Sequence, residues 1–203
     1  MSGSHNGVMP DRNDARTLNL LGALALALTD RIAAGARAES GLHESAAGAL
    51  IAIANHPGEP VETIRRALGL THSGAVRLVD GLEAAGLVER RRSDRDARAI
   101  ALWPTATGER TASAILAARA ELLEPVLVGM GKADRKAIVA LLETALAGLT
   151  DNADRARSIC RFCEEAICRP LGCPVERAAL HRAKTHKDRP RRRMAKRPAR
   201  RSD

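Results

Sequence analysis

Aromatic residues are nearly absent from this 203-residue chain, which has one Trp, one Phe and no Tyr. Sheet-rich domains favour aromatic and β-branched side chains, so a core built from Leu, Ala, Val and Ile indicates mainly helices. Single-stranded nucleic acids are held largely by bases stacked on aromatic rings, and the composition excludes that mode of binding. Apolar residues still make up 45% of the chain, which is enough for a folded core.

Long apolar runs are lacking too. The longest strongly apolar stretch is residues 18–28, whereas a membrane-spanning helix needs about 20 residues. Residues 11–16, just before it, carry two Asp and two Arg, unlike the positively charged start of a signal peptide. We therefore expect no membrane association and a cytoplasmic location, in a compartment that keeps cysteines reduced.

Neither sign of charge is in excess over residues 1–180, which hold 22 basic and 22 acidic residues. The net charge of +9 lies entirely in residues 181–203, where 11 Lys and Arg stand against two Asp. Any basic patch on the folded part must therefore come from the local arrangement of side chains rather than from bulk composition.

Helical periodicity accounts for most of the chain after a flexible N-terminus over residues 1–14. Gly86 follows the fourth helix, where a left-handed residue is needed, and a polar hairpin then joins two short strands. The fold class is therefore mainly α with a small β-hairpin wing (α+β). We predict helices over residues 15–39, 44–55, 61–68, 72–85, 107–128 and 134–149, and strands over residues 87–91 and 98–103.

The third and fourth helices are separated by only Gly69-Leu70-Thr71, which predicts a helix-turn-helix with Thr71 as the N-cap of the second helix. In such a unit the N-terminal part of the second helix enters the major groove of double-stranded DNA and reaches the base edges first. The residues predicted to contact DNA there are Thr71, His72, Ser73, Gly74 and Arg77.

The hairpin after this unit is rich in arginine. The negative potential of the minor groove attracts arginine, so the hairpin is predicted to be a DNA-binding wing. The alternative interpretation is a solvated turn with internal ion pairs. The predicted wing contacts are Arg92, Arg95, Asp96 and Arg98.

The segment Thr63–Arg90, TIRRALGLTHSGAVRLVDGLEAAGLVER, resembles the winged helix of MarR-type (multiple antibiotic resistance regulator) transcription factors. So does the stretch from Asp94 to Arg98, where Asp96-x-Arg98 is similar to that family's wing signature. The resemblance covers about residues 15–150. Trp103-Pro104 departs from it, because the family usually has a polar residue and Leu before the Thr, and this leaves the end of the second strand open.

The resemblance implies a homodimer on a pseudo-palindromic operator in double-stranded DNA. It implies dimerisation helices over residues 15–39 and 107–150 and a DNA-binding lobe over about residues 44–104. Asp96 and Arg98 would hold the wing in shape and meet the DNA backbone or minor groove. Many family members bind small aromatic acids between lobe and dimer helices, but this chain has few aromatics to line such a pocket, and the effector stays open.

All four cysteines lie in a separate segment, residues 151–180, at Cys160, Cys163, Cys168 and Cys173. Four thiolates can surround one metal ion, which predicts a zinc site. An iron–sulfur cluster is an alternative, because the terminal Cys173-Pro174 resembles the end of a ferredoxin motif. The segment could instead be a redox switch whose thiol pKa values are lowered by nearby arginines, or hold four inert thiols. Those arginines are Arg157, Arg161 and Arg169.

Residues 181–203 are expected to form a disordered basic tail, because they offer little to bury. Such a tail can add non-specific DNA affinity by releasing counterions, or it can be a solvated segment that adds only background affinity.

The sequence as a whole predicts a sequence-specific, non-enzymatic DNA-binding regulator that responds to metal or redox state through its cysteines. The resemblance implies a repressor, which is the most frequent role in that family. One alternative is an architectural DNA-binding protein with little sequence specificity. Another is a CxxC thiol–disulfide oxidoreductase, which needs its motif beside a βαβ unit, whereas the only predicted strands are those of the wing.

Overall fold

The computed structural model describes residues 11–93 and 100–187. The helices are α1 (Arg12–Ser40), α2 (Glu44–Asn55), α3 (Val61–Leu68), α4 (His72–Ala84), α5 (Ala106–Leu123), α6 (Lys132–Gly148), α7 (Ala153–Ile159), α8 (Glu165–Cys168) and α9 (Pro174–Lys187), with a short 3-10 helix, η1 (Glu124–Leu127). Strands β1 (Val88–Arg92) and β2 (Ile100–Pro104) form one antiparallel hairpin. The predicted fold class is confirmed.

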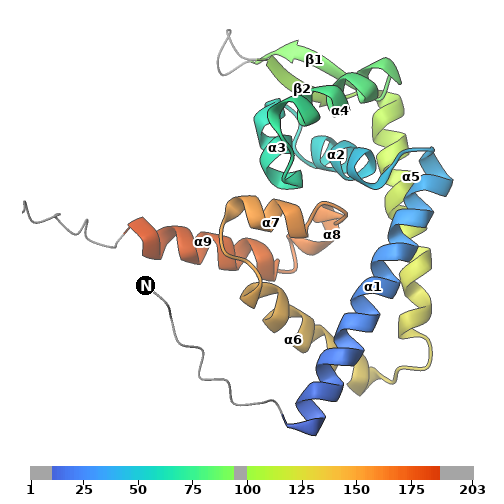
Figure 1. The fold of residues 1–203 in the computed structure, drawn as a ribbon, viewed down its shortest axis with the longest axis vertical. Helices are drawn as coiled ribbons and strands as arrows, with labels where there is room; N and C mark the ends of the chain where they lie inside the picture. Colours follow the sequence, from blue (N-terminus) through green and yellow to red (C-terminus); the bar gives the residue numbers. More distant parts are fainter. Residues whose placement is uncertain (1–10, 94–99, 188–203) are drawn as a thin grey trace, which may run out of the picture.

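Helix α2 is the centre of the core. Its residues 46–51 and Ile53 are buried, because α3, α4, α5 and β2 all pack around it (Figure 1). A helix enclosed in this way must be apolar on every side, and its sequence ESAAGALIAIAN has a polar residue only near each end. Figure 1 shows the lobe made by α2, α3, α4 and the hairpin at one end of the molecule, with α1 and α5 running side by side away from it.

The hairpin joins the lobe tightly to α5. Strand β2 extends to Pro104, which pairs with Val88, so the departure at Trp103-Pro104 leaves the strand intact. Thr105 then caps α5 and donates its hydroxyl to the carbonyl of Gly86 at 2.7 Å. At Gly108 a Cβ atom would overlap the carbonyl oxygen of Leu87, so only glycine allows α5 to start this close to the hairpin.

Most element ends lie within three residues of the sequence-based prediction; α1, for example, begins at Arg12, inside the N-terminus expected to be flexible to residue 14. Three larger differences remain. The helix expected to reach residue 128 ends at Leu123 and continues as η1, because Pro125 has no N–H and its ring clashes with the preceding helical turn. The segment after residue 150 forms three helices. Disorder was expected from residue 181, but α9 is helical to Lys187; residues 188–203 lie outside the described residues.

Apolar side chains remain exposed at the end of the molecule away from the hairpin. Helix α1 packs on α5 along one side but is long and apolar enough, by length and composition alone, to span a membrane. Helix α6 has no buried residue, although it contacts α9. The exposed apolar residues of the two helices include Leu18, Leu20, Leu21, Leu24, Leu26, Val139, Leu141 and Leu142.

Candidate nucleic-acid interface and cysteine pocket

Helix α4 presents its first turn to solvent. Thr71 is the N-cap, and its hydroxyl accepts a hydrogen bond from the backbone N–H of Gly74 at 3.1 Å. Ala75, Val79 and Leu82 are buried and fix the helix on the core. The opposite side leaves Thr71, His72, Ser73 and Arg77 exposed, with Gly74 half-buried. The structure therefore brings all five predicted residues of the recognition helix to one accessible edge.

The hairpin is tied to α4 by an arginine that was not among the predicted site residues. Arg90 on β1 pairs with Asp80 at 2.7 Å and with Glu83, both on α4. The spacing Asp80-x-x-Glu83 on the outer side of a helix, followed by an arginine just after the turn at Gly86, was the available signal. This clamp fixes the angle between the wing and the recognition helix.

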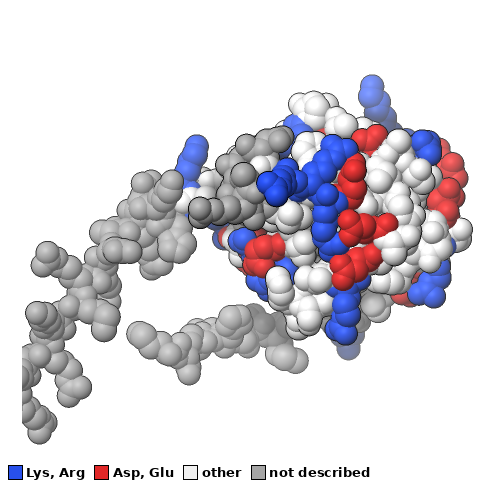
Figure 2. All heavy atoms as spheres, turned by 90° about the horizontal axis from the view of Figure 1, so that it is seen from above, with Lys and Arg blue, Asp and Glu red and all other residues white. Residues whose placement is uncertain are grey.

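The remaining wing arginines differ in whether they contact other side chains of the chain. Arg91 pairs with Glu89 and lies over the ring of Trp103, at 5.1 Å from its centroid. For Arg90 and Arg91 the alternative interpretation, internal ion pairs, therefore holds. Arg92 is exposed at the end of β1. Figure 2 looks down on the molecule from the end that carries the hairpin and shows basic and acidic side chains next to one another. The predicted contacts Arg95, Asp96 and Arg98 lie outside the described residues.

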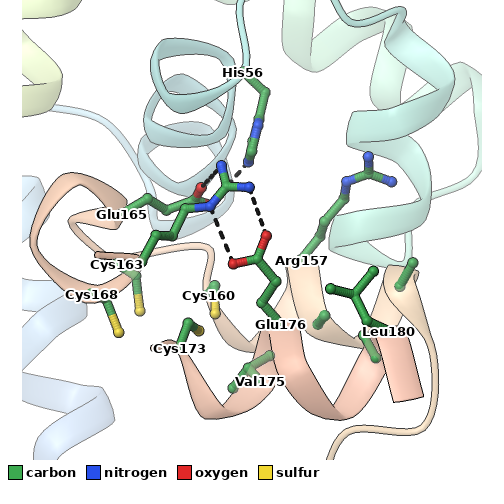
Figure 3. Close-up of a pocket in the computed structure, with 14 residues that line it drawn as sticks. His56, Arg157, Cys160, Cys163, Glu165, Cys168, Cys173, Val175, Glu176 and Leu180 are labelled. Carbon is green, nitrogen blue, oxygen red and sulfur yellow. Dashed lines mark hydrogen bonds and ion pairs between the residues drawn. The ribbon is translucent and has the colours of Figure 1, made fainter. Parts of the chain in front are cut away.

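All four cysteines line one cavity of about 290 Å³, which we call the cysteine pocket. Figure 3 shows the thiols of Cys160, Cys163, Cys168 and Cys173 gathered there, with His56 and Glu165 nearby. None of the four is in a disulfide. Within residues 11–93 and 100–187, no three His, Cys, Asp or Glu side chains are placed to hold a single metal ion. The thiols therefore share a cavity without converging on one point.

The thiols differ in acidity. A hydrogen bond from Cys160 and the positive charge of Arg119 lower the pKa of Cys163 to about 7. The same hydrogen bond, together with burial, raises the pKa of Cys160. Burial and the neighbouring Cys173 raise the pKa of Cys168. Cys163 is therefore poised to ionise near neutral pH.

Arg157, Arg161 and Arg169 were expected to lower the thiol pKa values. Of these three, Arg169 interacts electrostatically with Cys173. Each of the three faces a carboxylate: Arg157 lies 3.9 Å from Asp154, Arg161 lies 3.0 Å from Glu44, and Arg169 lies 2.7 Å from Glu176. The arginine that acts on Cys163 is Arg119 of α5, which the sequence places more than forty residues away.

The cysteine segment is fastened to the DNA-binding lobe. Phe162 is 7% exposed and belongs to the main core. The side-chain amide of Asn55 donates to the carbonyl of Cys163 at 3.1 Å. His56 bonds through Nε2 to Glu165 Oε1 at 2.9 Å, and this contact lowers the pKa of Glu165. Asn55 and His56 stand at the end of α2, so the pocket lies directly against the helix that supports α3 and α4.

Comparison with known proteins agrees with this geometry. Residues 40–99, which include α2, α3, α4 and β1 and end just before β2, match the sequence model of the MarR family. No curated protein sequence is similar enough to this chain to count as a match.

Several solved structures share the fold. A MarR-family transcriptional regulator from Silicibacter pomeroyi is 26% identical, with a TM-score of 0.50 over 62% of this chain and 87% of that one. The YusO protein from Bacillus subtilis is 20% identical, with a TM-score of 0.56 over 68% and 96%. CouR from Rhodococcus jostii RHA1, solved with p-coumaroyl-CoA bound, is 22% identical, with a TM-score of 0.51 over 62% and 88%.

These likenesses leave about a third of this chain unmatched. The capped recognition helix, the hairpin with its arginine clamp and the family match over residues 40–99 lead to one conclusion. Residues 40–99 of this chain are similar to the MarR family, within a fold that solved MarR-family regulators share.

Proposed function

We propose that this protein is a sequence-specific DNA-binding transcription regulator that acts as a homodimer. The observation that carries the proposal is α4, whose buried side fixes it on the core while its capped N-terminal turn is exposed. A helix presented in this way fits the major groove of double-stranded DNA. The family match over the same residues supports the proposal.

Separate residues have separate roles in this proposal. Ser73 and Gly74 are small and allow the backbone of α4 to approach the base edges. Arg77 is exposed and makes no ion pair within the described part of the chain, so its guanidinium is free to contact guanine or a phosphate. The clamp from Arg90 to α4 holds the wing at a fixed angle, so that Arg92, Arg95 and Arg98 reach the backbone or minor groove with Asp96 shaping the loop.

A second copy of the chain covers the exposed leucines of α1 and α6. Apolar surface of this extent is unusual on a soluble monomer and typical of an interface. Dimerisation through these helices places two copies of α4 on half-sites about one helical turn, roughly 34 Å, apart. Sedimentation of the wild type should give a dimer, and Leu21→Glu combined with Leu142→Glu should shift it toward the monomer. A monomeric wild type at micromolar concentration would contradict this assembly.

The protein would regulate transcription by occupying promoter DNA. A dimer bound across a promoter blocks polymerase, so repression is the simplest outcome, and the cysteine pocket against α2 offers a site through which metal or redox state changes DNA affinity. An architectural role predicts similar affinity for all DNA, whereas a regulator should prefer its operator at least roughly a thousandfold. An oxidoreductase would reduce disulfides catalytically, which a dithiol reductase assay measures directly.

Fluorescence anisotropy on selected operator DNA and on random DNA of equal length tests the proposal. Arg77→Ala should weaken operator binding by about 1–3 kcal/mol and relax the choice of one base pair. Arg12→Ala is the charge-matched control, because Arg12 is exposed at the start of α1, far from α4 in Figure 1. Equal affinity of the wild type for both DNAs would rule out sequence-specific regulation.

A further inference from the structure

The cysteine pocket gathers four thiols, but the described residues hold no ready-made site for a single metal ion. A zinc ion bound by four thiolates at about 2.3 Å holds all four sulfurs around one point. Here no three ligand side chains of the described chain are placed in that way, although all four thiols line one cavity. Its volume of about 290 Å³ is far above the roughly 10–15 Å³ that a single water molecule needs on the same measure.

We propose that the cysteine pocket binds an iron–sulfur cluster of the [4Fe–4S] type through Cys160, Cys163, Cys168 and Cys173, and that the bound cluster raises DNA affinity. Such a cluster takes one thiolate at each of its four irons, so its ligands surround a volume instead of a point. As each iron–sulfur bond forms, the cysteine gives its proton to solvent. The effect on DNA affinity rests on the proposed function.

The surroundings of the pocket suit an anionic cluster. Ala156, Val175, Ala179 and Leu180 contribute apolar walls, which keep water from the cluster. Arg157 lies in the pocket wall, and Arg119 lies close enough to Cys163 to act on it electrostatically. Arg119 Nε is also the one buried side-chain N or O atom without a hydrogen-bond partner in the part of the chain that the structure describes. Positive charge placed in this way offsets the negative charge of four thiolates.

The chain between the second and third cysteine connects the cluster to the DNA-binding lobe. The carbonyl of Cys163 accepts from Asn55, and Glu165, between Cys163 and Cys168, bonds to His56. Phe162, between Cys160 and Cys163, packs over Gly48 in the middle of α2. A cluster bound by Cys160, Cys163 and Cys168 therefore fixes the same segment that supports α2. Without it the segment loosens, and the support of α3 and α4 weakens.

The first experiment is metal and sulfide analysis of the full-length protein, purified and reconstituted anaerobically with ferrous iron and sulfide. The expected result is about four iron and four acid-labile sulfide per chain with broad visible absorption. Cys160→Ser and Cys168→Ser should lose the cluster. Leu171→Ala is the matched control, because Leu171 lies between the last two cysteines, is 82% exposed and should leave the iron content unchanged.

Two results would overturn the cluster. One is a single zinc per chain with no iron after anaerobic purification and reconstitution; the other is four free thiols and no metal. If the serine variants fail to fold by circular dichroism, the wild-type result alone decides, because it needs no substitution.

The second experiment compares the operator affinity of the wild type with the cluster and after its removal by a chelator. We expect at least tenfold weaker binding without the cluster. Asn55→Ala should keep the iron but shrink this difference, because it removes the hydrogen bond to Cys163. Equal affinities, or tighter binding without the cluster, would overturn the coupling. If neither form prefers operator to random DNA, the proposed function fails while the iron analysis still decides the cluster.

Discussion

Phe162 offers a direct test of whether the cysteine segment is part of the folded domain. It is the only phenylalanine of the chain and is 7% exposed, and a Cβ at Gly48 of α2 would lie 3.5 Å from its ring. Burying a phenylalanine side chain contributes about 1.5–3 kcal/mol by transfer alone. Truncation to alanine also leaves a cavity, so buried Phe→Ala changes cost about 3–5 kcal/mol.

The expected value for Phe162→Ala lies near the lower end, about 3 kcal/mol. Phe162 borders solvent-accessible space beside Arg161 and Cys163, so neighbouring side chains can partly close the gap. Urea unfolding followed by circular dichroism measures the loss, which at a typical slope of about 1–3 kcal/mol per molar moves the midpoint by at least about 1 M. All variants must be compared at one protein concentration, because unfolding of a dimer depends on it.

Leu171→Ala serves as the control from the same segment. Leu171 is largely exposed, so its truncation should stay within about 0.5 kcal/mol of the wild type. A change of less than about 0.5 kcal/mol for Phe162→Ala as well would refute the reasoning. It would mean that the segment after residue 150 contributes nothing to the stability of the lobe, and the route from the cysteine pocket to α2 would be lost.

Three further predictions concern residues that hold the recognition helix, the hairpin and the cysteine segment in place. Gly108→Ala should destabilise by about 1–3 kcal/mol or more in the same unfolding assay, because the new methyl group overlaps the carbonyl oxygen of Leu87; an unchanged midpoint would contradict the tight junction of hairpin and α5. Thr71→Ala should lower the free energy of unfolding by about 1 kcal/mol, because the N-cap hydrogen bond is lost, whereas Thr71→Ser should keep most of that stability. Equal losses in both variants would show that the cap hydroxyl is not the cause. The His56 contact lowers the pKa of Glu165 below its ordinary 4.5, so this contact adds stability above about pH 4.5 that is lost as the pH falls through the lowered value. Glu165→Gln should therefore flatten the decline of the urea midpoint between about pH 5 and pH 3, and a parallel decline in both proteins would speak against it.

Local structure was largely predictable, because it depends on neighbours in the chain. Helix α2 and helix α3 begin and end where the sequence places them. Their boundaries are set by residues at the ends, such as the break at His56-Pro57-Gly58 and the left-handed Gly69. The cap at Thr71 and the left-handed Gly86 were likewise predicted correctly. Pro125 shows the limit, because apolar periodicity continues through a residue that cannot extend the helix.

The candidate DNA-binding surface was predictable in part. Thr71, His72, Ser73 and Arg77 follow from helical phase, because the buried positions of α4 fix the opposite side as exposed. The sequence did not show which of the wing arginines have carboxylate partners. Arg90 and Arg91 look like Arg92 in the sequence, but the strand register and the position of α4 give the first two carboxylate partners.

The sequence by itself determined the helices up to residue 150 apart from their exact ends, the winged helix-turn-helix, the family resemblance and the grouping of four cysteines within a short segment. These features depend on periodicity, turn residues and short spacings, which a chain shows before it folds. Only the tertiary structure decided that Arg119 acts on Cys163. It alone placed Cys163 and Glu165 against Asn55 and His56, more than a hundred residues away. Contacts of that range depend on how helices pack in space, and the packing leaves no periodic trace in either segment.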